Sequence, residues 1–397
     1  MKQLKSIAVV GGGIIGLAIG YKLSLKNRVV TIFEKENAEG LHQSGRNSGV
    51  LHCGLNYEPG SLKAKLAVKG IREMISFARE NDIPHDICGK VVIASSKKEE
   101  FMLESLAKRG HKNGLLNLKF LNDYSLKIRE PFVRAKKALL VPEEGIIDYN
   151  AVMRVMINKI IENNGSIEFN TKINSIKNET KDEVQIKTAN GIKTFDNVIV
   201  CGGLWSDINF RQMTKVNSPL KIIPFRGEYL KFKPEFENLV NHLVYPVPNP
   251  RFPFLGVHFT RMIDGSREVG PNAVLSLKRD GYKRNSFSIK DTFESIGYIG
   301  LIRFLSKNFK FSVDEFKSSM FLEDFIAKAQ KMIPEVDATM LERGITGIRA
   351  QAISVSGELQ MDFNIIKRGR QIHVLNAPSP GATASLAIAS YIIDNYL

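Results

Sequence analysis

Three glycines near the start of the chain have the spacing that cradles the phosphates of a nucleotide. Gly11, Gly13 and Gly16 form a G-x-G-x-x-G motif directly after an apolar run, and Glu34 closes the next apolar run. In such a motif the first glycine permits a tight turn, the second lets the backbone approach a pyrophosphate, and the third lets a helix pack closely. A carboxylate after the second strand accepts the ribose hydroxyls. Glycine turns are common, but strand, helix, second strand and acid agree here, so the sequence predicts an adenine-dinucleotide site.

Two further segments are predicted to contact this ligand. The loop 41–57 combines small residues, hydroxyls, amides and two histidines, and such groups can wrap a pyrophosphate. A polar surface loop is the alternative. The apolar run 195–201 ends at Gly202 and Gly203, beside the only tryptophan, Trp205. We interpret this run as a buried strand whose glycine turn brings backbone to the ligand.

These motifs need helices and strands to position them, and hydrophobic periodicity predicts both. Helices are expected at 14–25, 62–81, 97–113, 149–163, over most of 288–333, and at 385–396. Strands are expected at 29–34, 88–96, 345–352, near Glu358 and at 371–376, with 142–148 as a turn. An antiparallel pair is expected from 167–176 and 184–188. An antiparallel sheet that floors a substrate pocket is expected from 221–225, 227–232, 243–246, 256–260 and 268–270.

The composition is that of an ordinary globular protein with a strong positive charge. The 397 residues are 43% hydrophobic and 24% charged, and at this length two domains are the expectation. The net charge of +15 has three interpretations: a funnel for an anionic substrate, a nucleic-acid or membrane-surface footprint, or lysine-rich faces without a partner. The chain has no block of five or six consecutive basic residues, which disfavours a nucleic-acid-binding tail.

Cysteine usage and apolar run lengths bear on the compartment. Cys53, Cys88 and Cys201 have neither metal-ligand spacing nor a pairing pattern, so no metal site is predicted and a reducing compartment is favoured. The first strand begins almost at once, which leaves no room for a signal peptide. The apolar runs fall short of the roughly 20 residues of a membrane span. The expected location is the cytoplasm, with peripheral association at the inner membrane as the alternative.

Several segments together carry a resemblance to a known family. The glycine motif with Glu34, the loop 44–57 and the segment 198–206 are similar to the D-amino-acid-oxidase-like family of flavoproteins. Similarity to the L-2-hydroxyglutarate oxidases and dehydrogenases of this family lies in the segments 42–52, 61–66, 224–227, 245–260, 270–273, 347–352 and 376–380. The departures are modest: Cys53 and Gly381 stand where other small residues are expected, and a proline expected after Thr260 is absent.

The resemblance implies FAD as cofactor and a mixed α/β (α+β) fold. In this fold a Rossmann-like FAD-binding domain interleaves with an antiparallel-sheet substrate domain. The FAD-binding domain is expected at 1–85, 145–220 and 340–397, and the substrate domain at 86–144 and 221–339. The cofactor-binding residues are expected to be Gly11, Gly13, Ile14, Ile15, Gly16, Glu34, Lys35, Gln43, Ser44, Asn47, Ser48, Gly49, Ile173, Cys201, Gly202, Gly203, Trp205, Gly347, Gly381, Ala382 and Thr383.

Oxidation of a 2-hydroxy acid, which the resemblance also implies, needs a base for the hydroxyl proton. A histidine suits this role because its ordinary pKa lies near neutrality. His52 and His258 lie in the sharpest motifs, and the choice between them stays open. A lone histidine is more often structural than catalytic, so each has a structural alternative.

The substrate carboxylate needs a cation, and the planar fork of arginine suits it best. Arg349 follows Gly347 at the place where related oxidases hold a carboxylate-binding arginine, so it is expected in both binding and catalysis. An interdomain salt bridge is its alternative role. Arg226 and Tyr245 are weaker candidates for the rest of a dicarboxylate.

Three functions follow, in order of preference. The first is FAD-dependent oxidation of a small anionic 2-hydroxy dicarboxylate, L-2-hydroxyglutarate, to 2-oxoglutarate, with hydride transfer to flavin N5 and oxygen or a quinone as electron acceptor. The second is an amine or amino-acid oxidase of glycine- or sarcosine-oxidase type, which needs an aromatic cage for a neutral amine. The third is a non-catalytic flavin- or nucleotide-binding protein whose basic surface binds RNA or anionic lipid.

Overall fold

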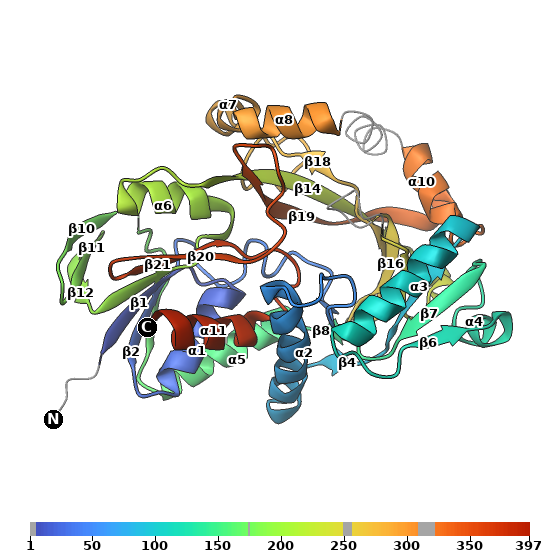
Figure 1. Ribbon diagram of the computed structural model, residues 1–397, viewed down its shortest axis with the longest axis horizontal. Helices are drawn as coiled ribbons and strands as arrows, with labels where there is room; N and C mark the ends of the chain where they lie inside the picture. Colours follow the sequence, from blue (N-terminus) through green and yellow to red (C-terminus); the bar gives the residue numbers. More distant parts are fainter. Residues whose placement is uncertain (1–4, 174, 249–255, 309–321) are drawn as a thin grey trace.

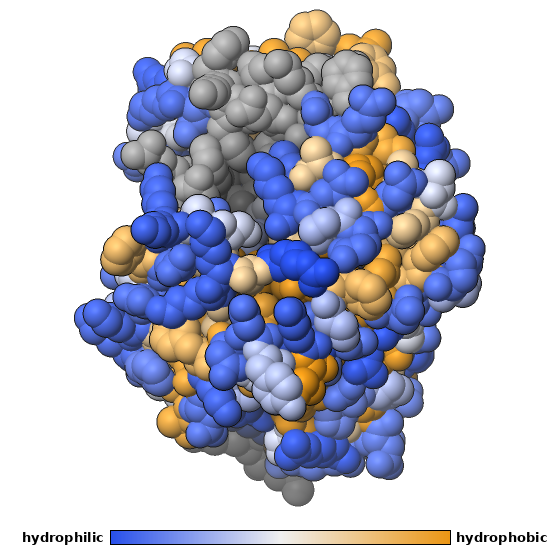
Figure 2. All heavy atoms as spheres, turned by 90° about the vertical axis from the view of Figure 1, so that its right-hand side faces the viewer, coloured by the Kyte–Doolittle hydropathy of each residue, from blue (hydrophilic) through white to orange (hydrophobic). Residues whose placement is uncertain are grey.

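The computed structural model describes residues 5–173, 175–248, 256–308 and 322–397. Two large sheets organise it, with helices packed around the first and along the edges of the second (Figure 1). Polar side chains dominate the face seen in Figure 2, and apolar side chains gather there in separate groups. Residues 309–321, part of the region predicted to be helical, lie outside the described residues.

The six-stranded sheet is built around the strand that carries the glycine motif. Its order is β20-β21-β13-β1-β2-β9, and β1 is parallel to both of its neighbours. Side chains of the three central strands are buried almost without interruption, as expected for parallel strands covered on both faces. The strands are β1 (Ser6–Val10), β2 (Val29–Phe33), β9 (Ser166–Glu168), β13 (Asn197–Val200), β20 (Asn364–Arg368) and β21 (Gln371–Asn376).

Four helices pack together beside this sheet and form much of the largest apolar core (Figure 1). They are α1 (Ile14–Ser24), α2 (Leu62–Glu80), α5 (Tyr149–Glu162) and α11 (Ser385–Tyr396), and each begins and ends within about one residue of its predicted bounds. α1 is apolar almost all round because it packs against helices as well as sheet. At Gly20 a Cβ atom would lie 2.6 Å from Ile32, so this glycine lets α1 approach the sheet.

The nine-stranded sheet follows the order β18-β14-β17-β16-β15-β5-β7-β6, with β19 paired to β14. Its pairs are antiparallel except β5 with β15, so the predicted antiparallel sheet is confirmed with one parallel junction. The two strands predicted at 221–225 and 227–232 are one continuous strand. The strands are β5 (Lys90–Ala94), β6 (Lys119–Leu121), β7 (Lys137–Val141), β14 (Leu220–Phe232), β15 (Leu243–Pro246), β16 (His258–Arg261), β17 (Arg267–Gly270), β18 (Val274–Leu275) and β19 (Leu341–Ser354).

Three predictions of secondary structure were wrong. The expected strand 167–176 is divided, because Asn170 takes a positive φ of 54° that ends β9. β9 then pairs with β2, while β10 (Ile176–Glu179) pairs with β11 (Val184–Thr188), and β11 pairs with β12 (Gly191–Phe195). Near Glu358 the chain forms a turn with Gly357 at φ 83°, and the strand is β20 instead. The turn predicted at 142–148 contains β8.

A small three-stranded sheet and several short helices complete the described fold. The sheet contains β3 (Val50–Leu51), β8 (Gly145–Ile147) and β4 (His85–Asp86), in that order. The helices are α3 (Lys97–Lys112), α4 (Asp123–Arg129), α6 (Ser206–Thr214), α7 (Ile289–Ile296), α8 (Ile299–Lys307) and α10 (Leu322–Gln330). Among the described residues, no helix is long and apolar enough to cross a bilayer. The domain boundaries stay a prediction; β19, which belongs to the expected FAD-binding segment 340–397, pairs with β14, most of which belongs to the expected substrate domain.

Candidate active site

A cavity of about 1030 Å³ runs from the glycine turn of the six-stranded sheet to the nine-stranded sheet. It is lined at one end by the turn after β1 and by Glu34, and at the other by His52, His258 and Arg349. Ligand pockets commonly enclose about 300–1,000 Å³. This cavity is therefore at the upper end, with room for a dinucleotide and a small substrate.

The glycine turn has the close contacts that the motif predicts. Gly11 takes a φ of 112°, and a Cβ atom on it would lie 2.4 Å from the carbonyl oxygen of Cys201 at the end of β13. On Gly16 a Cβ atom would lie 2.0 Å from the Gly11 carbonyl oxygen. Only glycine allows the turn, the strand end and the first turn of α1 to come so close.

The N-terminus of α1 opens into the cavity and is prepared for an anion. Gly13 caps the helix without a side chain, and the first turn of α1 contains no acidic residue. The Ile14 N–H donates to Ser44 Oγ at 3.0 Å, and the Ile15 and Gly16 backbone also lines the cavity. Helix N-termini stabilise phosphate through free N–H groups and the helix dipole. The chain's own geometry thus fits a pyrophosphate at this place.

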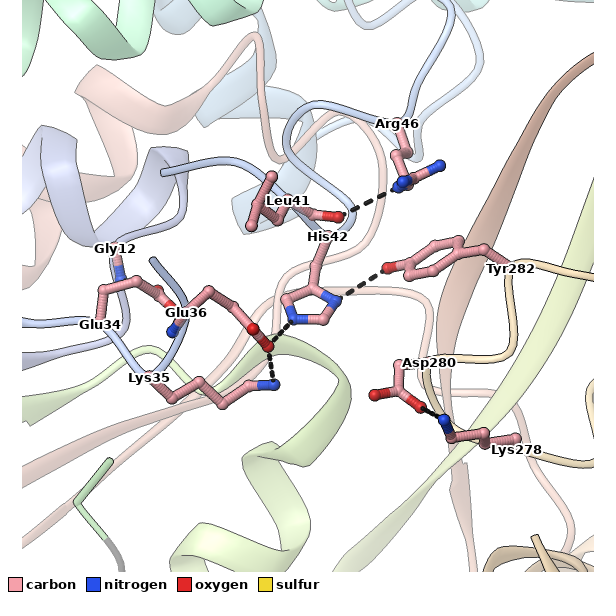
Figure 3. Close-up of polar contacts among 10 residues, drawn as sticks. All are labelled: Gly12, Glu34, Lys35, Glu36, Leu41, His42, Arg46, Lys278, Asp280 and Tyr282. Carbon is pink, nitrogen blue, oxygen red and sulfur yellow. Dashed lines mark hydrogen bonds and ion pairs between the residues drawn. The ribbon is translucent and has the colours of Figure 1, made fainter. Parts of the chain in front are cut away.

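Glu34 lies beside this turn with its carboxylate held by backbone. Oε2 accepts from the Gly12 N–H at 2.6 Å and Oε1 accepts from the Glu36 N–H at 2.9 Å (Figure 3). Each carboxylate oxygen has a second lone pair. Glu34 lines the cavity, and its acceptance of ribose hydroxyls stays a prediction.

A polar cluster beyond Glu34 joins the loop after β2 to the segment after β18. His42 contacts Glu36 Oε1 through Nε2 at 2.8 Å and the Tyr282 hydroxyl through Nδ1 at 3.0 Å (Figure 3). The Arg46 guanidinium lies 4.4 Å from the centre of the Tyr282 ring, and Lys35 Nζ lies 3.8 Å from that of Trp205. The cluster thus ties the two segments together, and Lys35, His42, Arg46 and Trp205 of it line the cavity.

Most of the predicted cofactor residues come together around this cavity. Its lining includes Gly11, Gly13, Ile14, Ile15, Gly16, Glu34, Lys35, Gln43, Ser44, Asn47, Ser48, Ile173, Cys201, Gly202, Gly203, Trp205, Gly347, Gly381, Ala382 and Thr383. Gly49 is the exception: it turns at φ 64° into β3, and its carbonyl oxygen accepts from the Ile147 N–H at 2.8 Å. Gly49 is not among the lining residues, and its direct contact with the cofactor stays a prediction.

The segment before α11 links the cavity wall to the loop that carries His52. The Thr383 hydroxyl accepts from the His52 backbone N–H at 3.2 Å and lies 2.7 Å from the Tyr149 hydroxyl. Gly381 and Ala382 line the cavity just before the helix, whose first turn is uncapped by any side chain. The Thr383 side chain thus bonds to the His52 backbone and to Tyr149, whereas Gly381 and Ala382 line the cavity.

His52 stands at the other end of the cavity against a buried carboxylate. Its Nδ1 lies 3.4 Å from Glu144 Oε2, and the same oxygen accepts from Lys90 Nζ at 2.7 Å. The Cys53 N–H donates to Glu144 Oε1 at 3.2 Å. Burial raises the pKa of Glu144, but the charge of Lys90 and the hydrogen bond with His52 outweigh it and hold that pKa well below its usual range. A carboxylate beside Nδ1 favours the tautomer whose Nε2 can accept a proton.

His258 is placed by a backbone contact and a stacked ring. Its Nδ1 lies 2.8 Å from the Gly256 carbonyl oxygen, which can only accept, so Nδ1 carries the proton and Nε2 the lone pair. The ring stacks on Tyr245 with centroids 4.0 Å apart. Burial, with the nearby charge of Arg349, lowers the pKa of His258 to about 3. His258 is therefore neutral near pH 7 and accepts hydrogen bonds better than protons.

Arg349 lies on β19 and reaches the cavity beside Tyr229 of β14. The Tyr229 hydroxyl is in hydrogen-bond contact with Arg349 and with Ser48. Burial raises the pKa of Tyr229, and the positive charge of Arg349 partly offsets this. The cation thus sits at the same end of the cavity as His258, where a substrate carboxylate would need it.

Arg226 is not among the residues that line the cavity, so its role as a substrate residue stays a prediction. Successive side chains of a strand point to opposite faces, and its neighbour Gly227 lines the cavity. Arg226 instead donates to Glu228 Oε1 at 3.1 Å and to the carbonyl oxygens of Lys283 and Arg284. It holds the segment after β18 against β14.

Glu144 and Lys90 were missed by the sequence analysis. Lys90 begins an otherwise apolar buried strand, and Glu144 directly precedes another. Both side chains are almost fully buried, and buried charges are rare unless they are paired. A lysine at the head of the run Val91–Ala94 was a usable signal for a buried pair, although the sequence did not identify its partner. Among the described residues, no group of three His, Cys, Asp or Glu side chains could hold a metal ion.

The neutral state of His258 makes the folded protein sensitive to acid. With a pKa of about 3 when folded and about 6.5 when unfolded, the unfolded chain binds more protons between these values. The free energy of unfolding therefore falls as pH drops from 6.5 towards 3. We expect His258→Gln to flatten the fall of the thermal midpoint over this range, relative to His111→Gln on the exposed end of α3. Equal slopes in both variants would contradict this assignment.

Comparison with known proteins agrees with this geometry. The family described as FAD dependent oxidoreductase (DAO) matches residues 6–395. An L-2-hydroxyglutarate dehydrogenase of Indibacter alkaliphilus is 41% identical over 391 residues, which cover 98% of each chain. The mitochondrial L-2-hydroxyglutarate dehydrogenase of Homo sapiens is 39% identical over 98% of this chain and 88% of its own length.

Solved structures show the same fold at lower sequence identity. A dithionite-reduced L-α-glycerophosphate oxidase of Mycoplasma pneumoniae with FAD bound has a TM-score of 0.78 at 21% identity, and covers 98% of this chain and 94% of its own. The glycine oxidase of Geobacillus kaustophilus has a TM-score of 0.72 at 17% identity, with the same coverage. The resemblance and the mixed α/β fold predicted from the sequence are confirmed. The cofactor is FAD, and the chain belongs to the DAO family of FAD-dependent oxidoreductases.

Proposed function

We propose that this enzyme oxidises L-2-hydroxyglutarate to 2-oxoglutarate. The observation that carries the proposal is one cavity with an anion-binding helix N-terminus at one end and Arg349 with two histidines at the other. Relatives 38–41% identical over nearly the whole chain bear the name of this activity. The bound FAD would accept the hydride that leaves the carbinol carbon.

Substrate binding is assigned to the cationic end of the cavity. The Arg349 guanidinium offers two parallel N–H donors to a carboxylate, and the net charge of +15 favours an anion at long range. Tyr245 stacks on His258, and its ring lies 5.1 Å from Lys90 Nζ, so it fixes both side chains. These residues orient the carbinol carbon and exclude water from it.

The hydroxyl proton is assigned to His52 rather than His258. Glu144 stabilises the imidazolium that forms when Nε2 of His52 takes the proton, as a carboxylate behind a histidine does in other enzymes. His258, with its pKa lowered to about 3, is a poor proton acceptor near neutrality. Its ring, stacked on Tyr245, instead forms part of the wall at the substrate end of the cavity.

Anaerobic bleaching of the flavin tests the activity directly. L-2-hydroxyglutarate added to the purified holoenzyme should remove the flavin absorbance near 450 nm, roughly the usual band of oxidised flavin, and should yield one 2-oxoglutarate per flavin reduced. The D-enantiomer, glycine and sarcosine serve as comparison substrates. Bleaching by glycine or sarcosine but not by L-2-hydroxyglutarate would assign an amine oxidase instead.

The amine-oxidase alternative has weaker support. It rests on the structural similarity to glycine oxidases, which are 17% identical to this chain. Similarity at this level of identity shows a shared fold but not a shared substrate. This alternative predicts an aromatic cage, the type of site that binds cationic amine groups. The described cavity instead adds the Arg349 cation to an end that holds the Lys90–Glu144 ion pair and the neutral His258, which leaves a net positive charge suited to a carboxylate.

Replacing Arg349 with lysine should affect substrate much more than flavin. Lysine keeps the charge but loses the bidentate fork, at a cost of about 1.5–3 kcal/mol, or about 10- to 150-fold in kcat/KM. Flavin content should stay unchanged. Arg343→Lys, at an exposed position on the same strand, is the matched control. Wild-type kcat/KM in Arg349→Lys would assign Arg349 to a structural role.

The electron acceptor and the location are further parts of the proposal. Oxygen and a quinone are both kept as acceptors, and stopped-flow reoxidation by air or by a soluble quinone analogue distinguishes them. We propose a cytoplasmic location with peripheral attachment to the inner membrane. The positive net charge supports such attachment, because cytoplasmic membrane surfaces are anionic.

A further inference from the structure

The helix α7 has its apolar side towards solvent. Ile289, Phe293 and Ile296 follow the spacing i, i+4, i+7 of one helix face, and they are 66%, 75% and 51% exposed. Of the eight residues of α7, only Ser295 is buried. An amphipathic helix on a globular protein normally buries its apolar stripe, so this orientation is inverted.

Polar contacts hold α7 in this orientation. Asp291 Oδ2 accepts from the Arg279 backbone N–H at 3.0 Å, and the Thr292 hydroxyl donates to the Leu277 carbonyl oxygen at 2.9 Å. Glu294 lies 3.9 Å from the buried Arg279 guanidinium. The inward side of the helix is thus its polar side, and these contacts keep the apolar side chains outside.

The next helix extends the apolar surface. α8 buries Leu301 and Phe304 in a core with β14 and β19, but leaves Ile299 and Ile302 exposed. With Phe287 ahead of α7, these side chains form an α7–α8 apolar stripe, which consists of Phe287, Ile289, Phe293, Ile296, Ile299 and Ile302. Figure 1 places both helices along the upper edge of the molecule, and Figure 2 shows apolar side chains at that edge.

The segment that carries the stripe exposes charges of one sign. From residue 283 to 307 the exposed charged side chains are all cationic, namely Lys283, Arg284, Lys290, Arg303 and Lys307. The two acidic residues of this span, Asp291 and Glu294, are half-buried and directed to Arg279. The loop 355–358, packed against α8, adds one exposed acid, Glu358, so the cations outnumber the acids at this surface. An apolar stripe with a mainly cationic rim fits a partner that is apolar inside and anionic outside.

We propose that the α7–α8 apolar stripe docks the enzyme on an anionic lipid bilayer. The apolar side chains would enter the boundary between headgroups and acyl chains, and the lysines and arginines would contact lipid phosphates. A second copy of this chain is the less favourable occupant, because its cations would face those of the first and its net charge is also +15. The assignment goes beyond the oxidation reaction, since none of the six stripe residues lines the cavity.

Vesicle co-sedimentation of the holoenzyme tests this surface. Vesicles of phosphatidylcholine with about 30% phosphatidylglycerol should bind the wild-type protein, and pure phosphatidylcholine vesicles should bind it at least tenfold more weakly. The double variant Phe293→Ser/Ile296→Ser should lose at least tenfold in binding to the anionic vesicles. Lys283→Glu/Lys307→Glu should weaken the same binding and reduce its dependence on salt.

A matched control removes equally exposed apolar surface elsewhere. Phe101 on α3 and Tyr124 on α4 are 73% and 76% exposed, so Phe101→Ser/Tyr124→Ser should bind vesicles as the wild type does. Flavin content and turnover of L-2-hydroxyglutarate, measured on the same samples, should stay at wild-type values in the stripe variant. This readout keeps a failure of docking separate from a failure of the proposed oxidation.

Three results would overturn the docking proposal. The wild-type protein could stay in the supernatant with anionic vesicles, which would remove the lipid surface as occupant. The stripe variant and the α3/α4 control could bind equally well, which would place the contact elsewhere. Light scattering could give a dimer for the wild type and a monomer for Phe293→Ser/Ile296→Ser, which would assign the stripe to a second copy of the chain.

Discussion

His52→Gln should slow flavin reduction by L-2-hydroxyglutarate by about 100- to 10,000-fold, the usual contribution of a general base. Glutamine keeps a polar side chain of similar reach, but it cannot take the hydroxyl proton. Flavin content should be retained, because the His52 contact with Thr383 is made by the backbone N–H. Rapid-mixing absorbance under anaerobic conditions measures the loss.

The pH dependence of that reaction distinguishes the two histidines. Histidine ordinarily titrates between pH 5 and 8, so a base of this type makes the rate of flavin reduction rise over that range. A base with the pKa of about 3 that burial gives His258 would leave the rate flat above pH 5. We expect the rise to persist, at a lower rate, in His258→Gln and to vanish in His52→Gln. If the rate still rises with pH in both variants, neither histidine is the base, and the hydroxyl proton goes to water or to another side chain.

Glu144 should act on the reaction only through His52. In Glu144→Gln the amide can turn its NH₂ group towards Nδ1, which would impose the tautomer with its proton on Nε2 and block the base. The substitution also leaves Lys90 buried without its carboxylate, so the thermal midpoint should fall as well. Glu144→Gln at a temperature well below its midpoint should therefore show full flavin content with slow reduction.

The helices around the cofactor could be predicted from the sequence almost to the residue. α1, α2 and α11 combine apolar periodicity with clear ends, such as Ser61, whose side chain accepts from the Ala64 N–H and caps α2. β9 could not be predicted in this way. It is three residues long, and its place beside β2 depends on pairing across more than 130 positions of sequence.

The glycine motifs marked one end of the site because their function depends on local backbone geometry. The reactive end depends on contacts between distant elements, and there the sequence was less informative. Glu144 and Lys90 meet from the turn before β8 and from the start of β5, and no local pattern links them. Arg226 stands beside Gly227, which lines the cavity, but its own side chain bonds to Glu228 instead. Strand alternation predicts which of two neighbouring residues faces a ligand only when the ligand-facing side of the strand is known.

Gly13→Val should abolish FAD binding while leaving the protein folded. Gly13 has φ −76° and ψ 172°, a conformation open to any residue, so valine adds no backbone strain. The only atom near a Cβ at this position is Ser44 Oγ at 3.0 Å, a hydroxyl that can rotate away. The added methyl groups would instead fill the space at the N-terminus of α1, where the pyrophosphate has to approach.

The purified Gly13→Val protein should therefore be colourless, with a circular dichroism spectrum close to that of the wild type stripped of flavin. Its thermal midpoint should no longer rise when FAD is added, whereas that of the stripped wild type should. Gly13→Ala/Ser44→Ala is the control, because it carries the smaller side chain and lacks the Ser44 contact, so a partial loss of affinity is expected. Full flavin occupancy in folded Gly13→Val would place the pyrophosphate elsewhere in the cavity and remove the α1 N-terminus from the cofactor site.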